Sequence, residues 1–240
     1  MIGFILAAGF GTRLKPLTDT VPKALVPVCG EPLLAHNLRR LHNSGVFSAI
    51  GVNSHYLHAL MERFQKSSPV LFQLFYEREK IRGTGGALDF ARDFLSADDA
   101  FLIANVDILH KFDIAELSTR FMESGRICSL VSVPVKAGGT ILYDGESFDF
   151  IGVSSQKNTY IEADEAQFTG VTFYRREFLN FVNKDDFSII PVWQRALAAG
   201  DVPGILTPQK PASWWMDIGT HEALASIESS VKNGEIDLWN

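Results

Sequence analysis

The stretch ILAAGFGTRLKPLTDTVPKALVPV, residues 5–28, changes character within a few positions. Its apolar run ends at Ala8 and gives way to Gly9-Phe10-Gly11, which predicts a buried strand followed by a tight loop. The rest of the stretch contains three basic residues and three prolines: Arg13, Lys15, Pro16, Pro22, Lys23 and Pro27. What this loop binds is therefore the first question that the sequence raises.

The residue types of this loop favour phosphate. Glycines let backbone N–H groups approach a phosphate closely. Arg13 could hold phosphate oxygens with paired hydrogen bonds, and Lys23 could add a point charge, while Pro16 and Pro22 stiffen the span between them. The loop is not a dinucleotide fingerprint, because Leu14 stands where the third glycine belongs, and no Gly-Lys-Ser/Thr follows as in a Walker loop. A solvated basic loop would explain the charges alone, but not the glycines and prolines at a strand end.

The composition narrows the class of protein. The 240 residues carry a net charge of −6, with 46% hydrophobic and 21% charged residues, which excludes a general nucleic-acid surface. No run of about 18 apolar residues predicts a membrane span. Cys29 and Cys128 lie in no metal-binding pattern and are expected to be reduced thiols of a cytoplasmic protein. We expect one domain over 1–240 that divides into halves at 1–125 and 126–240, as a monomer or homo-oligomer.

The hydrophobic pattern predicts an α/β fold. In the first half, strands are expected at 2–7, 46–53, 70–76 and 100–105, alternating with helices at 32–44, 55–65 and 84–95. In the second half, strands are expected at 127–135, 140–143, 148–153, 168–174 and 202–207, and helices at 187–199 and 220–232. Alternating strands and helices indicate a mostly parallel sheet covered on both faces. Ligands of such sheets bind at the carboxyl ends of the strands, where residues 9–23, 82–86 and 105–107 are predicted to meet.

The opening segment, extended to residue 34, resembles a known family signature. LAAGFGTRLKPLTDTVPKALVPVCGEPLL, residues 6–34, closely resembles the signature of the sugar-1-phosphate nucleotidyltransferases, LAxGxGTRLxPLTxxxPKxLxPxxxxP. The resemblance implies a Rossmann-like three-layer fold with a mixed, mostly parallel central sheet. It also implies transfer from an NTP to a sugar 1-phosphate, giving an NDP-sugar and pyrophosphate, with Arg13 and Lys23 as catalytic residues. The implied nucleotide-binding residues are Leu6, Ala7, Ala8, Gly9, Gly11, Thr12, Arg13, Thr84, Gly85 and Asn105.

The same resemblance implies a Mg²⁺ cofactor. Asn105-Val106-Asp107 resembles the family's Asn-Gly-Asp, and residues 214–221, WWMDIGTH, resemble its WxDxGT segment, so Asp107 and Asp217 match the two metal ligands. Val106 replaces the usual glycine and could narrow the space beside the metal. From the residues alone, each aspartate could equally be a turn residue or a helix cap. For the sugar phosphate, the resemblance implies Lys23, Gly170, Lys157 and Trp215.

The sequence does not decide which nucleobase or which acceptor phosphate the protein would use. The segment GTGGAL at 83–88 and the ending WMDIGT look most like short bacterial uridylyltransferases that act on N-acetylmuramic acid 1-phosphate in cell-wall recycling. Guanylyltransferases for mannose or heptose 1-phosphate and thymidylyltransferases for glucose 1-phosphate share these residues. A cytidylyltransferase for choline phosphate would need an aromatic cage, for which the candidates are Trp214, Trp215, Tyr160 and Tyr174. A non-catalytic regulatory protein that binds nucleotide sugars is the remaining alternative.

Overall fold

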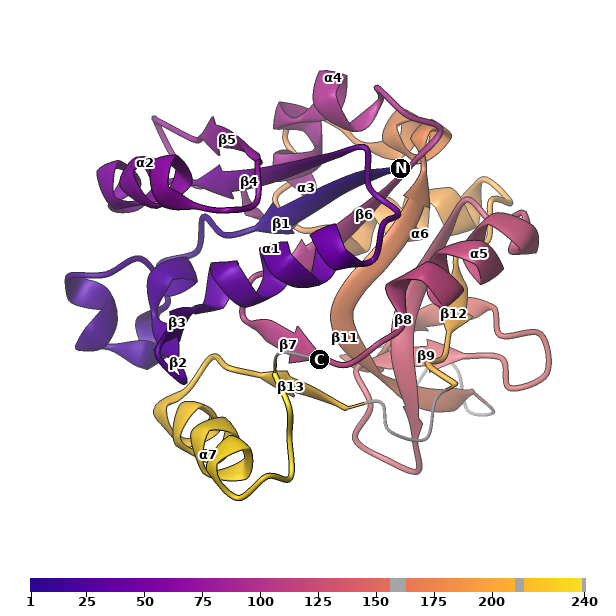
Figure 1. Ribbon diagram of the computed structural model, residues 1–240. Helices are drawn as coiled ribbons and strands as arrows, with labels where there is room; N and C mark the ends of the chain where they lie inside the picture. Colours follow the sequence, from indigo (N-terminus) through magenta and orange to yellow (C-terminus); the bar gives the residue numbers. More distant parts are fainter. Residues whose placement is uncertain (156–162, 210–213, 239–240) are drawn as a thin grey trace.

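The computed structural model of the protein describes residues 1–155, 163–209 and 214–238 (Figure 1). Its centre is a sheet in which the strands β5 (Gln73–Tyr76), β4 (Ala49–Ser54), β1 (Ile2–Leu6) and β6 (Ala100–Asn105) lie in that order and are all parallel. All four strands therefore end at the same edge of the sheet, and the loops that follow them gather there.

The strands of the second half extend the same sheet. The long strand β11 (Asp164–Arg175) runs antiparallel to β6 and to β8 (Cys128–Val135), and its first residues pair with β9 (Ile141–Tyr143). β10 (Phe150–Val153) pairs with β9, and β12 (Gly204–Leu206) runs parallel to β8. The predicted α/β fold with a mixed central sheet, parallel through its first half, is confirmed.

Helices cover both faces of this sheet, as the continuous apolar strands require. On β1, Ile5 packs in a core with α1 (Leu33–Asn43), α2 (His58–Ser67) and α5 (Ile114–Ser124). Ile2 and Phe4 of the same strand pack in a second core, with α3 (Gly83–Phe90), α4 (Arg92–Leu95) and α6 (Ile190–Ala198). The alternation of side chains along one strand thus produces three layers.

A third core lies below the loops at the carboxyl edge. There α7 (His221–Lys232) contributes Ile227, which packs with Leu14 of the opening loop and with Ile218. The opening loop itself consists of three 3₁₀ turns, Thr12–Leu14, Leu17–Asp19 and Lys23–Leu25, followed by the short ribbon of β2 (Pro27–Val28) and β3 (Glu31–Pro32). Helix α7 is therefore packed against the opening loop through this core.

Several elements differ from the predictions. No element was predicted for 106–126, where the structure has β7 (Ile108–His110) and α5. α5 carries ordinary helix signals, since Asp113 accepts a hydrogen bond from the Glu116 N–H and Gly125 ends the helix in the left-handed conformation. The helix expected over 84–95 is two short helices that meet at Ala91. α6 begins at Ile190 rather than at 187, because the preceding loop packs against α3 instead.

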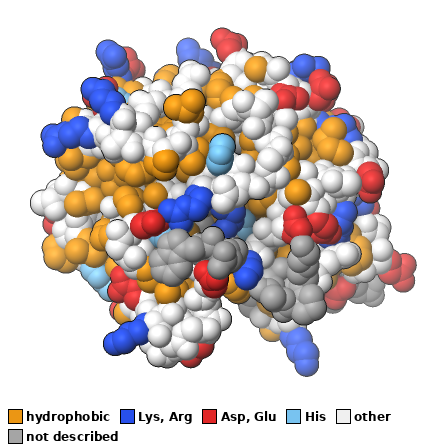
Figure 2. Space-filling model, viewed as in Figure 1, with side chains coloured by type: hydrophobic (Ala, Val, Ile, Leu, Met, Phe, Trp, Pro, Cys, Tyr) orange, Lys and Arg blue, Asp and Glu red, His pale blue; other side chains and the backbone are white. Residues whose placement is uncertain are grey.

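The visible face of the molecule carries charges of both signs. On the face seen in Figure 2, with α1 in front, basic and acidic side chains lie interspersed with apolar ones outside the grey residues. Within 1–155, 163–209 and 214–238, no helix has the length and apolar character needed to cross a membrane.

Candidate active site

A cavity of about 170 Å³ lies at the carboxyl ends of the parallel strands. It is bounded by the ends of β1, β4 and β6 and by the turn that precedes α3. The lining residues are Leu6, Ala8, Gly9, Lys23, Asn53, Ile81, Gly83, Thr84, Asn105, Val106 and Asp107. Three segments that are far apart in the sequence and were predicted to meet at this edge therefore line one cavity.

Gly11 allows the opening loop to fold back tightly. Its φ is +64°, and a Cβ added there would lie 2.9 Å from both Lys23 Cβ and Thr18 Cγ2. The Thr18 hydroxyl also donates a hydrogen bond of 2.9 Å to the Gly11 carbonyl. A larger residue at position 11 would thus be strained and would displace Lys23. The glycine brings the far end of the loop, with its lysine, to the cavity.

Lys23 forms an ion pair with Asp107, and both side chains are mostly buried, with 13% and 16% exposed. The turn that carries Asp107 is fixed on both sides of Val106. The Val106 N–H donates to the Leu6 carbonyl at 3.1 Å, and the Asn37 amide donates to the Val106 carbonyl at 2.9 Å. The Val106 side chain is 3% exposed and packs in the first core with α1 and α5. Asp107 is thus held in a turn, and no helix uses it as a cap.

The ribbon of β7 and β13 (Trp215–Asp217) brings the second aspartate beside the first. These strands are antiparallel, and Asp217 pairs with Ile108. The Ile218 N–H donates to the Asp107 carbonyl at 2.7 Å. Asp217 is not the cap of α7, because Thr220 accepts the capping hydrogen bond from the Ala223 N–H at 3.2 Å. Two aspartates more than a hundred positions apart in the sequence therefore lie on adjacent backbone segments.

Arg13 lies against this second aspartate. Its Nη2 is 3.6 Å from Asp217 Oδ2, in an ion pair whose side chains are 58% and 43% exposed. A Cβ added at Gly219 would lie 2.6 Å from Asp217 Oδ1 and would also overlap the Arg13 guanidinium. The glycine of the WMDIGT segment thus gives this pair room, and a larger residue there would have to displace the Arg13 or the Asp217 side chain. Arg13 keeps an exposed face that a ligand can reach.

Asp107 and Asp217 are the residues of this site that could hold a hard divalent cation. Asp217 Oδ1 is buried and has no hydrogen-bond partner among the described residues, which leaves a carboxylate oxygen available as a metal ligand. Within the described ranges no group of three or more His, Cys, Asp or Glu side chains is arranged to hold a metal ion. Mg²⁺ does not need such a group, since it is commonly bound by one or two carboxylates together with substrate phosphates and water.

Buried residues behind the ribbon hold it in place. His110 of β7 is 2% exposed, stacks on Phe112 and accepts a hydrogen bond from the Phe112 N–H at 3.1 Å. Burial, assisted by the positive charge of Arg40, holds the pKa of His110 well below its ordinary value, so this imidazole is neutral. The Arg40 guanidinium lies 5.8 Å from the centre of the Trp214 ring, and burial lowers the pKa of Arg40 to about 10.

The remaining predicted residues are distributed unevenly around the cavity. Gly170, with φ +80°, lies in the register shift between β11 and β8, and a Cβ there would lie 3.0 Å from Asn105 Nδ2. Trp215 pairs with His110 across the ribbon. Lys157 lies outside the described residues. The cavity lining does not include the predicted residues Ala7, Gly11, Thr12, Arg13 and Gly85. Ala7 lies between two lining residues in the sequence, and Arg13 pairs with Asp217, whose neighbour Ile218 is hydrogen-bonded to Asp107.

The proposed aromatic cage for a quaternary ammonium is not formed by its described members. Tyr174 is 1% exposed in the second core and accepts a hydrogen bond from Trp193 Nε1 at 3.1 Å. Trp214 packs with the third core and Trp215 with the first, so Tyr174 does not join them. Tyr160 lies outside the described residues.

Two polar residues, one lining the cavity and one behind it, were not among the predicted site residues. Asn53, at the end of β4, accepts the Ala7 N–H at 2.6 Å and donates to Glu77 Oε1 at 2.8 Å. Glu77 Oε2 accepts the Arg82 N–H at 2.7 Å, and the Glu77 side chain is almost fully buried. This network ties together the segments after β1, β4 and β5. The only sequence indication was a polar residue at the end of each apolar strand.

Glu77→Leu is expected to destabilise the protein by about 2–6 kcal/mol, because the Asn53 amide and the Arg82 N–H would each lose a buried acceptor at about 1–3 kcal/mol. Chemical denaturation of the variant and the wild type measures this difference. Glu79→Leu, a change of the same type two residues along on an exposed side chain, is the control. Equal unfolding free energies for Glu77→Leu and the wild type would contradict the role assigned to this network.

Comparison with known proteins identifies the family. The model described as "Nucleotidyl transferase" matches residues 2–234, so the chain belongs to the nucleotidyl transferase family. It is 29% identical over 239 residues to N-acetylmuramate alpha-1-phosphate uridylyltransferase of Caulobacter vibrioides, covering 95% of this chain and 96% of that protein. It is 34% identical over 155 residues to the mannose-1-phosphate guanylyltransferase catalytic subunit beta of Danio rerio, where the match covers 61% of this chain and only 42% of the relative.

The fold has close neighbours among solved structures. A candidate glucose-1-phosphate thymidylyltransferase from Bacillus anthracis, solved in complex with sucrose, superposes with a TM-score of 0.77 at 18% sequence identity. The superposition covers 99% of this chain and 97% of that one. At this identity the likeness concerns the fold, and it extends over both halves of the sheet.

Proposed function

We propose that the protein catalyses Mg²⁺-dependent transfer of a nucleotidyl group from an NTP to a sugar 1-phosphate. The observation that carries this proposal is the position of two cation–carboxylate pairs at one sheet edge. Lys23–Asp107 lines the cavity, and Arg13–Asp217 adjoins it through the hydrogen-bonded ribbon of β7 and β13. Two cations and two carboxylates suit a reaction between two phosphate esters, in which charge must be held and neutralised.

The chemistry requires no nucleophile from the protein. A phosphate oxygen of the sugar 1-phosphate forms a bond to the α-phosphorus of the NTP, while the bond from that phosphorus to the bridging oxygen breaks and pyrophosphate leaves. Lys23 would orient the attacking phosphate and offset the repulsion between the two anions. Arg13, with its exposed guanidinium, would hold the β- and γ-phosphates as they depart. The protein's contribution is therefore positioning and electrostatic stabilisation.

Asp107 and Asp217 would hold the Mg²⁺. When bound, the ion supplies Lewis-acid stabilisation of the charge on the phosphoryl oxygens. The buried and unpartnered Oδ1 of Asp217, and the short backbone link from Ile218 to Asp107, support this assignment. To bind the ion, Asp107 and Asp217 would have to give up part of their contacts with Lys23 and Arg13.

The nucleotide would occupy the cavity between the opening loop and the turn before α3. Leu6, Ala8, Gly9, Thr84 and Asn105 line it, and Gly170 lies beside Asn105 on the side of the second half. We infer that residues 1–125 bind the nucleotide and 126–240 the sugar phosphate, within one domain. The free thiols of Cys29 and Cys128 support a cytoplasmic location.

The preferred substrates are UTP and N-acetylmuramic acid 1-phosphate, which would give the enzyme a role in cell-wall recycling. The support is that the Caulobacter vibrioides uridylyltransferase matches this chain over nearly the full length of both proteins. GTP with mannose 1-phosphate is the second candidate, supported by the higher identity to the Danio rerio guanylyltransferase subunit over a shorter segment.

Pyrophosphate release tests the reaction and both candidates together. UTP, GTP, CTP, dTTP and ATP are each combined with Mg²⁺ and a panel of acceptors that includes N-acetylmuramic acid, mannose, heptose and glucose 1-phosphates and choline phosphate. Release that is largest for UTP with N-acetylmuramic acid 1-phosphate is the expected result. Release with GTP and mannose 1-phosphate would favour the second candidate. Binding of an NTP without release for any acceptor would favour a regulatory protein.

A further inference from the structure

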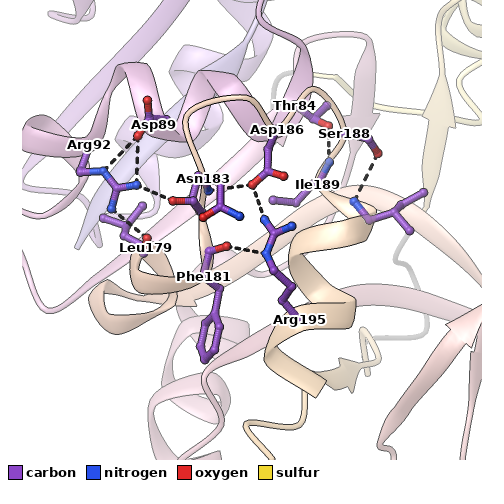
Figure 3. A network of polar contacts seen from close by, with 12 residues as sticks. Thr84, Asp89, Arg92, Leu179, Phe181, Asn183, Asp186, Ser188, Ile189 and Arg195 are labelled. Carbon is purple, nitrogen blue, oxygen red and sulfur yellow. Dashed lines mark hydrogen bonds and ion pairs between the residues drawn. The ribbon is translucent and has the colours of Figure 1, made fainter. Parts of the chain in front are cut away.

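The loop of residues 183–189, here called the docking loop, lies on the glycine-rich start of α3 (Figure 3). Three glycines of the segment GTGG make this contact possible. An added Cβ would lie 2.9 Å from the Phe187 ring at Gly83, 2.7 Å from the Ser188 carbonyl oxygen at Gly85, and 2.8 Å from the Asp186 carbonyl oxygen at Gly86. Any other residue at these positions would push the docking loop away.

Hydrogen bonds join the docking loop to the wall of the cavity. The Gly85 N–H donates to the Phe187 carbonyl at 3.0 Å, and the Ile189 N–H donates to the Thr84 hydroxyl at 2.9 Å. Thr84 and Gly83 both line the candidate nucleotide cavity. The docking loop therefore contacts the outer side of the turn whose inner side forms the cavity wall.

The docking loop is itself anchored by two arginines. Arg195 of α6 forms an ion pair with Asp186 and donates to the Phe181 carbonyl at 2.9 Å. Asp186 also accepts the Asn183 N–H at 2.7 Å, and its side chain is only 10% exposed. Before the loop, Arg92 of α4 donates to the Leu179 and Val182 carbonyls, each at 2.8 Å.

We propose that the docking loop positions the cavity wall for the NTP, and that Asp186 is the positioning residue through which it acts. The inference rests on the proposed function. Removing the Asp186 charge would leave Arg195 without its carboxylate and free the loop to move, so the Gly83–Thr84 wall would lose its outer support. Lys23 and Gly170, which would bind the sugar phosphate, lie on other segments than the docking loop and the start of α3, so we expect its binding to depend less on this support.

Asp186→Asn tests the proposal with a variant that keeps the side-chain shape and an acceptor oxygen. Affinity for UTP and for GTP with Mg²⁺ is measured by titration calorimetry without an acceptor, so no transfer takes place. We expect about tenfold weaker NTP binding, because a small misplacement of a binding group is costly. The KM for the sugar phosphate should change less than about twofold, since its contacts are unaltered. Faster amide hydrogen exchange is expected across 81–86.

Asp149→Asn is the matched control. Asp149 pairs with Arg126, and Arg126 also donates a hydrogen bond to the Ser147 carbonyl at 2.8 Å. Arg126 lies just before the start of β8, and neither it nor Asp149 lines the cavity. Its NTP affinity should equal that of the wild type. Gly86→Ala, which presses on the docking loop from the α3 side, should reproduce the Asp186→Asn pattern and serves if Asp186→Asn does not fold.

The outcomes separate the two proposals. Wild-type protein that binds no NTP would overturn the proposed function, and this inference with it. Wild-type protein that binds an NTP, with unchanged affinity in Asp186→Asn or in its substitute Gly86→Ala, would overturn the inference alone. An equal loss of affinity for NTP and sugar phosphate would assign the docking loop a general structural role and would also overturn it.

Discussion

Asp107→Ala is expected to lower kcat at least about a hundredfold, since stabilisation of phosphoryl charge by a metal ion amounts to several kcal/mol. The fold should survive, because the turn that carries Asp107 is held by backbone hydrogen bonds of Val106 to Leu6 and Asn37, which the substitution leaves in place. Pyrophosphate release at saturating substrates measures the effect, and thermal unfolding checks the fold. The change also frees Lys23 from its ion pair, so a partial compensation through tighter phosphate binding would appear in KM and not in kcat.

A second variant and a distant control sharpen this test. Asp107→Asn preserves volume and removes only the charge, so it should lose nearly as much activity as Asp107→Ala. Asp149→Ala removes an aspartate from an ion pair far from the cavity and should leave kcat within about twofold of the wild type. An Asp107→Ala enzyme with wild-type kcat would contradict the metal assignment, and with it the reaction proposed for this site.

The main body of the fold could be predicted because its strands are buried on both faces. Continuous apolar runs such as 100–105 are short enough to favour a strand over a helix, the periodicity of the segments between them predicts helices, and a parallel sheet is covered by helices on both faces. The ribbon of β7 and β13 could not be found this way. Each of its strands has three residues, too few for a periodic pattern, and its pairing depends on contacts between distant segments.

The candidate site residues come partly from residue type and partly from the family resemblance. Arg13 and Lys23 stand out as cations in a loop with glycines and prolines after an apolar strand, whereas the metal role of Asp107 rests on the resemblance and stays a prediction. Gly83, Gly85 and Gly86 illustrate the limit. In the sequence they resemble a nucleotide-facing turn, yet Gly85 and Gly86 meet the docking loop, which lies a hundred residues further along the chain. A glycine indicates a close approach, but the sequence does not say of what.

Lys23→Met is expected to have the second large effect. Methionine keeps the apolar length of the lysine stem, which the close packing of Lys23 Cβ against Gly11 requires, and removes the ammonium. Because Lys23 would orient the attacking phosphate and also stabilise the charge that develops during transfer, kcat should fall about 10²–10³-fold. The KM for the sugar 1-phosphate should rise as well, whereas the KM for the NTP should change less.

Lys15→Met provides the control within the same loop. Lys15 is also paired with an aspartate, Asp19 at 3.0 Å, but its side chain is 58% exposed and it does not line the cavity. Its loss removes one positive charge from the loop without touching the site, so a general electrostatic effect would appear equally in both variants. Full activity in Lys15→Met together with a large loss in Lys23→Met would assign the effect to the position of the ammonium. Comparable kinetics for the two variants would contradict a specific role for Lys23, because the net charge of the loop would then be sufficient.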